Sequence, residues 1–214
     1  MKKFTIAMVI IFALILSFTA NAQLVSFGVG GGLTQVLGPD HYTTEVSEAG
    51  LGFSSEYNFG AVAKISLPLI PITPRAFVIY HKLSGNGRVT ILAPGDGLVE
   101  VDREYSQSIL SLGAGVQYGF IPIPAGFDPY LSLDATYNNF GDFSRITDGY
   151  DENLTDGFSR FGLQLGIGTE VTIIPMINVD VFVGYNWYNL TGKEDGEETV
   201  SSFVLDVFLM FNFL

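Results

Sequence analysis

The sequence predicts an all-β protein, a single eight-stranded antiparallel up-and-down transmembrane β-barrel that is preceded by a cleaved signal peptide. Two observations predict this fold. Segments in which apolar and polar residues alternate recur along most of the chain, and long polar loops take turns with short, proline-containing connections between them. A period of two places successive side chains on opposite faces of a strand. An even number of strands, with long loops at one end and short turns at the other, is typical of membrane barrels.

The last fourteen residues, 201–214, show the strongest strand pattern. One row of alternate positions is entirely apolar, whereas the other contains Asp206 and Asn212. The apolar row consists of Phe203, Leu205, Val207, Leu209, Phe211 and Phe213. At ~3.3 Å per residue this row spans about 36 Å, enough for a tilted crossing of a ~30 Å hydrocarbon core. The segment is therefore predicted to close a membrane barrel.

The first 22 residues predict a signal peptide. Lys2 and Lys3 form a positive start, residues 6–16 are almost wholly apolar, and Ala20-Asn21-Ala22 fits a small-x-small cleavage site. We therefore expect residues 1–22 to be removed and residues 23–214 to form the barrel domain; a membrane anchor helix is the alternative. The chain has no cysteine, which excludes disulfides, thiolate metal sites and a lipid-modified cysteine.

The charge of the expected mature chain excludes one class of partner. It keeps all 22 acidic residues against eight basic ones, a formal charge of −14. Nucleic-acid binding requires clustered Lys and Arg to neutralise phosphates, so no nucleic-acid partner is predicted. An acidic chain that is also rich in glycine and aromatic residues is unusual for a soluble protein. It is understandable if the acids lie in loops and the apolar residues face lipid.

Eight segments are predicted as strands. They are 24–36, 56–67, 75–84, 101–120, 130–140, 158–173, 179–188 and 201–214. The register of the third strand stays open, because Phe77 with Ile79 and Val78 with Tyr80 are equally good outward pairs. A loop at residues 85–99 is expected to extend the third hairpin beyond the membrane.

Alternation alone also fits a soluble lipocalin-like barrel with its apolar residues inside. Glycines on the polar face, charges of both signs on that face and aromatic residues near strand ends favour an apolar face toward lipid. The charged residues predicted to form a structural network in the lumen are Glu56, Lys64, Arg103, Asp134, Arg160, Glu170, Asp180 and Asp206. The predicted interfacial aromatics are Tyr57, Phe59, Tyr118, Phe120, Tyr137, Tyr185 and Trp187.

The position of each charged residue along its strand predicts which members of this network lie close together. Lys64, Glu170 and Asp180 are all expected near the short-turn end of the barrel. Asp206 is expected to pair inside the lumen with Arg103 or Arg160, because a buried charge must be paired or neutralised.

The signal peptide, the eight alternating strands with four long loops and three short turns, and the apolar final strand together resemble the OmpA/OmpX-type small outer-membrane barrels. They are similar as well to the porin-like outer membrane protein beta-barrel domain family. The resemblance implies the outer membrane of a Gram-negative bacterium, a monomer, contact with lipid and lipopolysaccharide, and insertion by the barrel assembly machinery. It further implies a C-terminal assembly signal at Phe211, Phe213 and Leu214, although members commonly end in an aromatic residue and this chain ends in Leu214.

The function that the sequence favours is a structural or surface-interaction role with a side-chain-filled lumen. A narrow channel for small solutes or ions is the alternative, and a lipid A-modifying enzyme is a weaker one. For the enzyme, His41 with Ser47 and His81 with Ser84 are the candidate pairs, but no nucleophile motif surrounds them. No catalytic, cofactor-binding or metal-binding residues are predicted. The acidic loops could attract divalent cations, yet they lack a D-x-D-x-D-G spacing.

Overall fold

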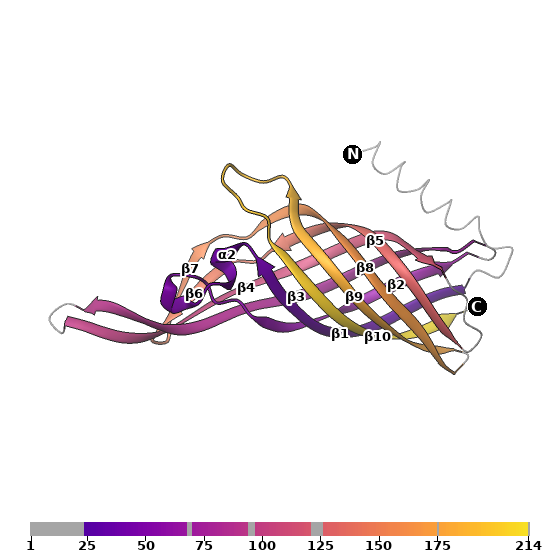
Figure 1. Cartoon of the computed structure of the whole chain (residues 1–214), viewed down its shortest axis with the longest axis horizontal. Helices are drawn as coiled ribbons and strands as arrows, with labels where there is room; N and C mark the ends of the chain where they lie inside the picture. Colours follow the sequence, from indigo (N-terminus) through magenta and orange to yellow (C-terminus); the bar gives the residue numbers. More distant parts are fainter. Residues whose placement is uncertain (1–23, 68–69, 94–96, 121–125, 175, 214) are drawn as a thin grey trace, which may run out of the picture.

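The computed structural model describes residues 24–67, 70–93, 97–120, 126–174 and 176–213. Eight long strands form the ring of a barrel (Figure 1). They are β1 (Leu24–Gly38), β2 (Ser55–Ser66), β3 (Ile72–Ala93), β4 (Gly97–Gly119), β5 (Phe127–Phe140), β8 (Phe158–Ile174), β9 (Ile177–Thr191) and β10 (Ser201–Phe213). The predicted signal peptide and the last residue of the predicted assembly signal, Leu214, lie outside the described residues.

Every neighbouring pair in the ring is antiparallel. Strands that follow one another along the ring are joined as hairpins, and β1 closes the ring by pairing with β10 from Val25↔Phe213 to Gly38↔Ser201. A closed sheet satisfies each strand's backbone donors and acceptors between strands, which a lipid environment requires because it offers no water. The predicted fold class, an eight-stranded antiparallel barrel, is confirmed.

Further elements lie at the long-loop end. β6 (Phe143–Thr147) and β7 (Tyr150–Thr155) form a hairpin inside the loop between β5 and β8, and β6 pairs with β4. The loop after β1 carries a single helical turn, α2 (Asp40–Thr43), and a 3-10 turn, η1 (Val46–Glu48). None of the described helices has the length and apolar character needed to span a membrane.

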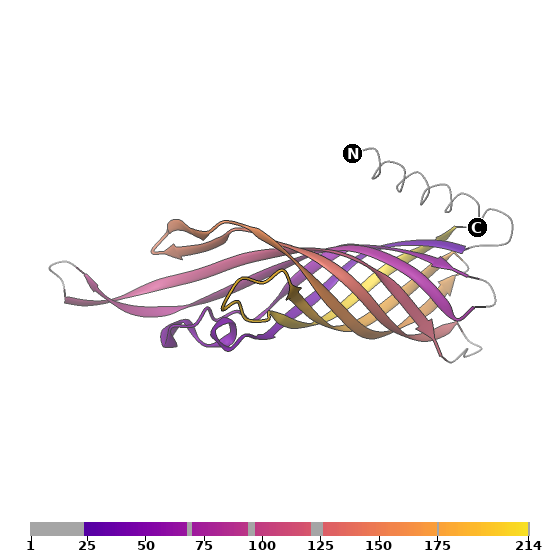
Figure 2. The ribbon, with the colours of Figure 1, turned by 90° about the horizontal axis from the view of Figure 1, so that it is seen from above.

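The third hairpin is much longer than its neighbours. β3 and β4 stay paired from Ile72↔Tyr118 to Ala93↔Gly97, so the two strands continue as a ribbon well past the barrel (Figures 1 and 2). The expectation that residues 85–99 extend this hairpin is correct, with strand pairing in place of most of the predicted loop.

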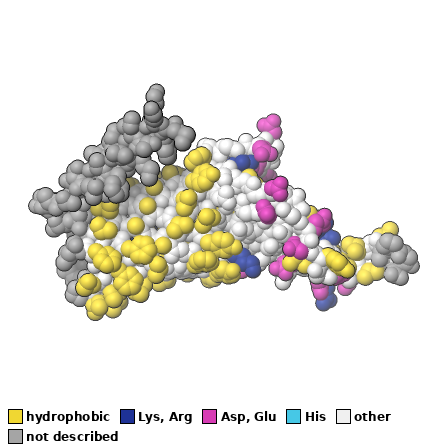
Figure 3. Space-filling view, turned by 180° about the vertical axis from the view of Figure 1, so that it is seen from behind, with side chains coloured by type: hydrophobic (Ala, Val, Ile, Leu, Met, Phe, Trp, Pro, Cys, Tyr) yellow, Lys and Arg dark blue, Asp and Glu magenta, His cyan; other side chains and the backbone are white. Residues whose placement is uncertain are grey.

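The outer wall of the barrel is apolar. Figure 3 shows hydrophobic side chains spread over the barrel and the acidic side chains gathered toward the loop end. On β10 every second residue faces outward, and Phe203 and Leu205 are 48% and 46% exposed, whereas Asp206 between such positions is fully buried. A closed antiparallel ring with an outward-facing apolar band is the arrangement of membrane-spanning barrels. The lipid-facing assignment of the apolar row therefore holds.

The structure settles the register of the third strand. Phe77, Ile79 and His81 are buried and point inward, whereas Val78 on the opposite face is 38% exposed. This register also turns Arg75 into the lumen, where it is 8% exposed.

Glycines on the inner face make room for large inward side chains. At Gly113 on β4, a Cβ atom would lie 2.1 Å from the ring of Phe77 on the neighbouring strand. A similar approach occurs at Gly166 on β8, where the ring of Phe182 would be 2.2 Å away. The glycines of the polar face therefore let the aromatic residues fold across the lumen.

We predict that Gly113→Val destabilises the barrel by about 1–3 kcal/mol, the usual cost of overpacking a filled interior. Urea unfolding of the refolded protein in lipid vesicles, followed by circular dichroism, measures this change. Ala114→Val is the matched control, because Ala114 follows directly on the lipid face and is exposed. Equal stability of the two variants would contradict the role assigned to Gly113.

Candidate functional site

A buried ionic cluster occupies the short-turn end of the lumen. Lys64 on β2 donates hydrogen bonds from Nζ to Glu170 Oε1 on β8 at 2.7 Å and to Asp180 Oδ2 on β9 at 2.6 Å. The hydroxyl of Tyr130 on β5 donates to Asp180 Oδ1 at 2.7 Å. The Lys64 side chain is only 1% exposed, so the two carboxylates balance its charge in place of water. The structure thus brings together the three residues that were expected near this end.

A second ion pair lies higher in the lumen and was missed by the sequence reasoning. Arg75 on β3 donates from Nε to Asp134 Oδ1 on β5 at 2.8 Å and from Nη2 to Gln164 Oε1 on β8 at 3.0 Å. Its guanidinium also lies over the rings of Phe182 and Phe77, at 4.8 and 5.3 Å from their centroids. Arg75 escaped notice because the register of its strand could not be read from two equally apolar rows.

Asp206 has a different partner from the one predicted. Its Oδ1 accepts a hydrogen bond from Asn58 Nδ2 at 2.8 Å, and it pairs with neither Arg103 nor Arg160. Arg103 lies on the part of β4 that pairs with β6 outside the barrel, and Arg160 turns toward the loop after β9. Both guanidinium groups are therefore too high along the axis to reach Asp206, so the predicted pairing is wrong.

An apolar layer fills the middle of the lumen. Its members come from β2, β3 and β10 and are Val62, Phe77, Ile79, Phe208 and Met210. The void bordered by this layer and by Arg75, Asp180 and Asp206 measures about 10 Å³, enough for a single water molecule. Side chains thus occupy most of the lumen at this height.

Polar side chains above this layer form a hydrogen-bonded chain. Asn58 Nδ2 also donates to Thr34 Oγ1 at 3.1 Å, and Thr34 Oγ1 lies 2.8 Å from His81 Nδ1. The hydroxyls of Tyr188 and Ser202 are 2.8 Å apart. These groups are buried, and each reaches its neighbour on another strand, so the network links strands on several sides of the barrel.

Neither histidine forms the serine pair that was considered for catalysis. His81 contacts Thr34, whereas Ser84 donates a hydrogen bond to Glu56, another residue of the predicted network. The Nδ1 of His41 lies 3.1 Å from Glu198 Oε2, and Ser47 donates to its neighbour Glu45. Neither candidate serine therefore lies next to its histidine, and the hydroxyl that contacts His81 is that of Thr34.

Apolar residues also close the mouth of the barrel at the long-loop end. We call them the mouth cluster, and its members are Val36, Val46, Phe53, Leu83, Tyr105, Ile109, Phe140, Tyr188 and Val200. The loop after β1 supplies Val46 and Phe53, which are 3% and 2% exposed although they lie in a stretch that reads as polar. This loop therefore folds inward over the lumen.

Hydrogen bonds of Glu197 with Arg160 and Asn189, which we call the clasp, hold the loop after β9 at the rim of the barrel. Arg160 donates from Nε and Nη2 to Glu197 Oε2 at 2.9 and 2.7 Å, and Asn189 Nδ2 donates to Glu197 Oε1 at 2.7 Å. Burial by itself raises the pKa of Glu197, but hydrogen bonds from Arg160, Asn189 and the Glu194 amide outweigh it and lower that pKa to about 2. Arg160 thus stabilises the loop and does not take part in a charge network inside the lumen.

The predicted interfacial aromatics lie on the outer wall. Five of them are between 40% and 55% exposed: Tyr57, Phe59, Tyr118, Phe120 and Tyr137. Tyr185 and Trp187 are half-buried against each other, with ring centroids 4.5 Å apart. In the predicted assembly signal, Phe213 is 54% exposed and Phe211 is half-buried, both on the lipid face.

The described residues contain no group of three or more His, Asp or Glu side chains that could hold a metal ion. Several loop carboxylates have basic partners instead; for example, Arg145 donates to Glu152 at 2.5 Å and Arg88 donates to Asp102 at 3.1 Å.

Comparisons with known proteins agree with this architecture. No protein-family model and no curated protein sequence matches the chain. Among solved structures, a major outer membrane protein from Thermus thermophilus matches 90% of this chain and 100% of its own, with a TM-score of 0.54 and 14% identity. Neisserial surface protein A matches 89% of this chain and 96% of its own, with a TM-score of 0.50 and 17% identity.

These likenesses concern the fold. The chain has the architecture of the small outer-membrane barrels, which confirms the predicted resemblance to the OmpA/OmpX type. The outer membrane is the location that this fold and its apolar wall define, as the sequence predicted.

We predict that Lys64→Met destabilises the barrel by about 3–5 kcal/mol, because it leaves Glu170 and Asp180 as uncompensated buried charges. Urea unfolding in vesicles measures the loss. Lys193→Met, in an exposed loop, is the control and should leave stability unchanged. Adding Glu170→Gln and Asp180→Asn to Lys64→Met should recover most of the loss; no recovery would show that the lysine contributes by packing alone.

We predict that Glu197 titrates near pH 2 in the folded protein, below its ordinary pKa of 4.5. A depressed folded pKa means that the contribution of Glu197 to stability is complete above about pH 4.5 and is lost as the pH falls from there to about 2. Carboxyl carbon chemical shifts from glutamate-labelled protein follow this titration. Arg160→Gln should move it up toward 4.5, whereas Arg145→Gln should not; a Glu197 titration near 4.5 in the unmodified protein would contradict the clasp.

Proposed function

We propose that the protein is a bacterial outer-membrane β-barrel with a structural or surface-interaction role, a lumen closed by side chains and no enzymatic activity. In this proposal residues 23–214 are the mature barrel domain, monomeric, inserted by the barrel assembly machinery and surrounded by lipid and lipopolysaccharide. The long loops face outward from the cell and the short turns face the periplasm.

The observation that carries the closed lumen is the succession of three obstructions along its axis. The Lys64 cluster lies at the short-turn end, the apolar layer around Phe208 in the middle, and the mouth cluster at the long-loop end. An eight-stranded barrel has an interior just wide enough for side chains to fill. Together these features support a packed interior over an aqueous pore.

The surface role is supported by the distribution of ordered structure outside the membrane. The β3–β4 ribbon, the β6–β7 hairpin and the folded loop after β1 all lie at the long-loop end (Figures 1 and 2). Such elements are paired or packed, so they present a defined surface on which a binding site can be built.

A narrow channel is the second candidate, and one observation favours it. Asp134 Oδ2 and Asp206 Oδ2 are buried and make no hydrogen bond within the described part of the chain, so the lumen retains polar groups that water or an ion could contact. A small rearrangement of the apolar layer would have to connect these groups before any solute could pass.

We predict that the purified protein, reconstituted in a planar lipid bilayer, shows no stable porin-sized conductance. The reason is that the three obstructions fill the lumen at successive heights. A sixteen-stranded porin in the same bilayer is the positive control, since barrels of that size enclose an aqueous channel. A reproducible large conductance from this protein would overturn the closed-lumen proposal, whereas rare, small openings would favour the narrow channel.

A further inference from the structure

The apolar band of the outer wall has a defined upper border on six neighbouring strands. In each outward row the continuous run of apolar residues ends, and a polar residue follows two positions nearer the long-loop end. We call these polar residues the collar, and its members are Gln35, Ser55, Lys82, Ser108, Asn139 and Ser159. Aromatic residues such as Tyr57 and Tyr137 lie directly below it, so the collar marks the boundary between lipid and water.

The collar consists of three cross-strand pairs, and two of them satisfy their own polar groups. Ser55 donates a hydrogen bond to Gln35, its partner on β1. Asn139 Nδ2 donates to Ser159 Oγ, on the neighbouring β8, at 3.0 Å.

The third pair, Lys82 on β3 and Ser108 on β4, lies between the other two. Neither side chain makes a hydrogen bond to the side chain of another described residue, and Lys82 forms no ion pair within the described part of the chain. Lys82 is also the charged member of the collar. This pair therefore keeps hydrogen-bond donors and a positive charge for another partner.

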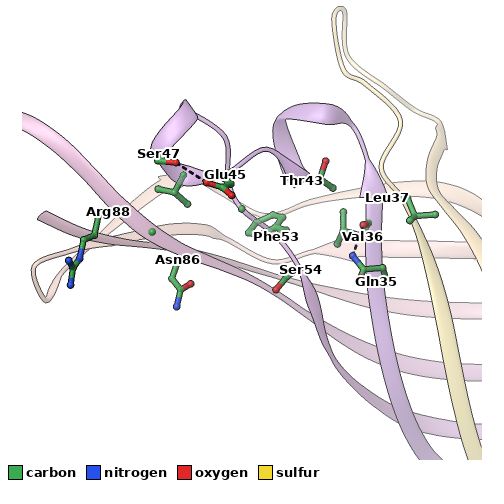
Figure 4. A pocket seen from close by; sticks show the side chains of 13 residues that line it. Gln35, Val36, Leu37, Thr43, Glu45, Ser47, Phe53, Ser54, Asn86 and Arg88 are labelled. Atoms are coloured by element: carbon green, nitrogen blue, oxygen red, sulfur yellow. Dashed lines mark hydrogen bonds between the residues drawn. The ribbon is translucent and has the colours of Figure 1, made fainter. Parts of the chain in front are cut away.

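The next basic residue on the outward row of β3 is already paired. The side chains of Asn86 and Arg88 point away from the loop of residues 39–54, which folds over the lumen on the other face (Figure 4). Arg88 donates to Asp102 at 3.1 Å. Lys82 differs from Arg88 in lying at the membrane border and in lacking such a carboxylate.

The nearby carboxylates leave Lys82 accessible to an anion from the lipid side. Glu56 on β2 accepts a hydrogen bond from Ser84 and forms no ion pair with Lys82. On the outward row of β4, the first carboxylate beyond Ser108 is that of Glu104, four residues away and so about 13 Å along the strand. An anion at Lys82 thus meets no like charge on this part of the outer wall.

An aromatic ring holds the ammonium group at the border. The Nζ of Lys82 lies 5.8 Å from the centroid of the Tyr57 ring, which is stacked on Phe59. A cation–π contact of this kind orients the ammonium without using its N–H groups as a carboxylate would. Lysine offers three donors and no acceptor, and the Ser108 hydroxyl adds a further donor. Such a set suits an oxyanion with several acceptor oxygens.

From these observations we propose that Lys82 and Ser108 bind the phosphate group of an anionic membrane lipid. The proposal rests on the function proposed above, because it requires this band to lie in lipid, and it adds the ligand group and its site. The membrane delivers a lipid phosphate sideways to the collar. A free anion must instead pass the acidic loops of a chain with an expected formal charge of −14 (Figure 3).

Native mass spectrometry of the mature protein, refolded in an uncharged detergent, tests this site by lipid titration. The probes are lipid A and phosphatidylglycerol, each compared with its phosphate-free counterpart, dephosphorylated lipid A and diacylglycerol. We expect at least one of the two phosphate lipids to bind at least fivefold more tightly than its counterpart. Preference for lipid A alone identifies a glycolipid as the source, and preference for phosphatidylglycerol alone identifies a phospholipid.

Lys82→Met should remove this preference, because it deletes the charge and keeps most of the apolar stem. Lys193→Met, in an exposed loop, is the control and should leave the preference unchanged. Adding Ser159→Lys to Lys82→Met returns the charge to the collar at another strand and should not restore binding. Circular dichroism confirms that each variant is folded.

Three results would overturn the lipid phosphate site. They are the absence of any preference for phosphate, an equal loss in the Lys193→Met variant, and recovery by Ser159→Lys, which would show attraction by charge alone. Displacement of the lipid by inorganic phosphate at the same concentration would show a free anion site and would likewise contradict the proposal.

Failure here and failure of the proposed function are separable. A barrel that shows no conductance and no phosphate preference keeps its closed lumen and loses only this site. A barrel that conducts like a porin yet binds the lipid through Lys82 keeps the site and loses the closed lumen.

Discussion

Closure of the sheet is the constraint on which the rest of the molecule depends. Backbone donors and acceptors cannot be left unpaired in hydrocarbon, so β1 at one end of the barrel domain must pair with β10 at the other. Once the ring is closed with eight strands, its interior is narrow. The inward row must then be filled, which is why glycines face the rings of Phe77 and Phe182. The closed lumen that we propose would thus be a consequence of closing a small ring.

Closure also determines where function can be placed. The wall inside the membrane is committed to lipid on one face and to packing on the other, so its polar groups serve mainly to satisfy one another, as Lys64 does with Glu170 and Asp180. Above the membrane the ring is no longer obligatory. There β2 reaches only to Ser55 while β3 and β4 continue, and the loop after β1 packs over the lumen beside them.

The sequence predicted the barrel well because alternation reports directly on which face a residue occupies. It also predicted that Lys64, Glu170 and Asp180 share one end, since their distance from the short turns can be counted along each strand. It failed for Asp206, because a shared face does not say which residue lies opposite across a lumen, and Glu197 in a loop holds Arg160 away. The inward position of Arg75 was missed because the register of its strand could not be read from the sequence. The burial of Val46 and Phe53 was missed because apolar residues scattered through a polar loop show no periodic pattern.

One outward residue has a consequence for how the molecule can be observed. Trp187 is the only tryptophan of the chain, and it lies on the outer wall beside Tyr185 near the long-loop end of β9. Its indole is therefore an intrinsic fluorescent probe that lies at the boundary between lipid and water. Quenchers attached at known depths along lipid tails would read the height of the barrel in the bilayer from one residue, without labelling the protein.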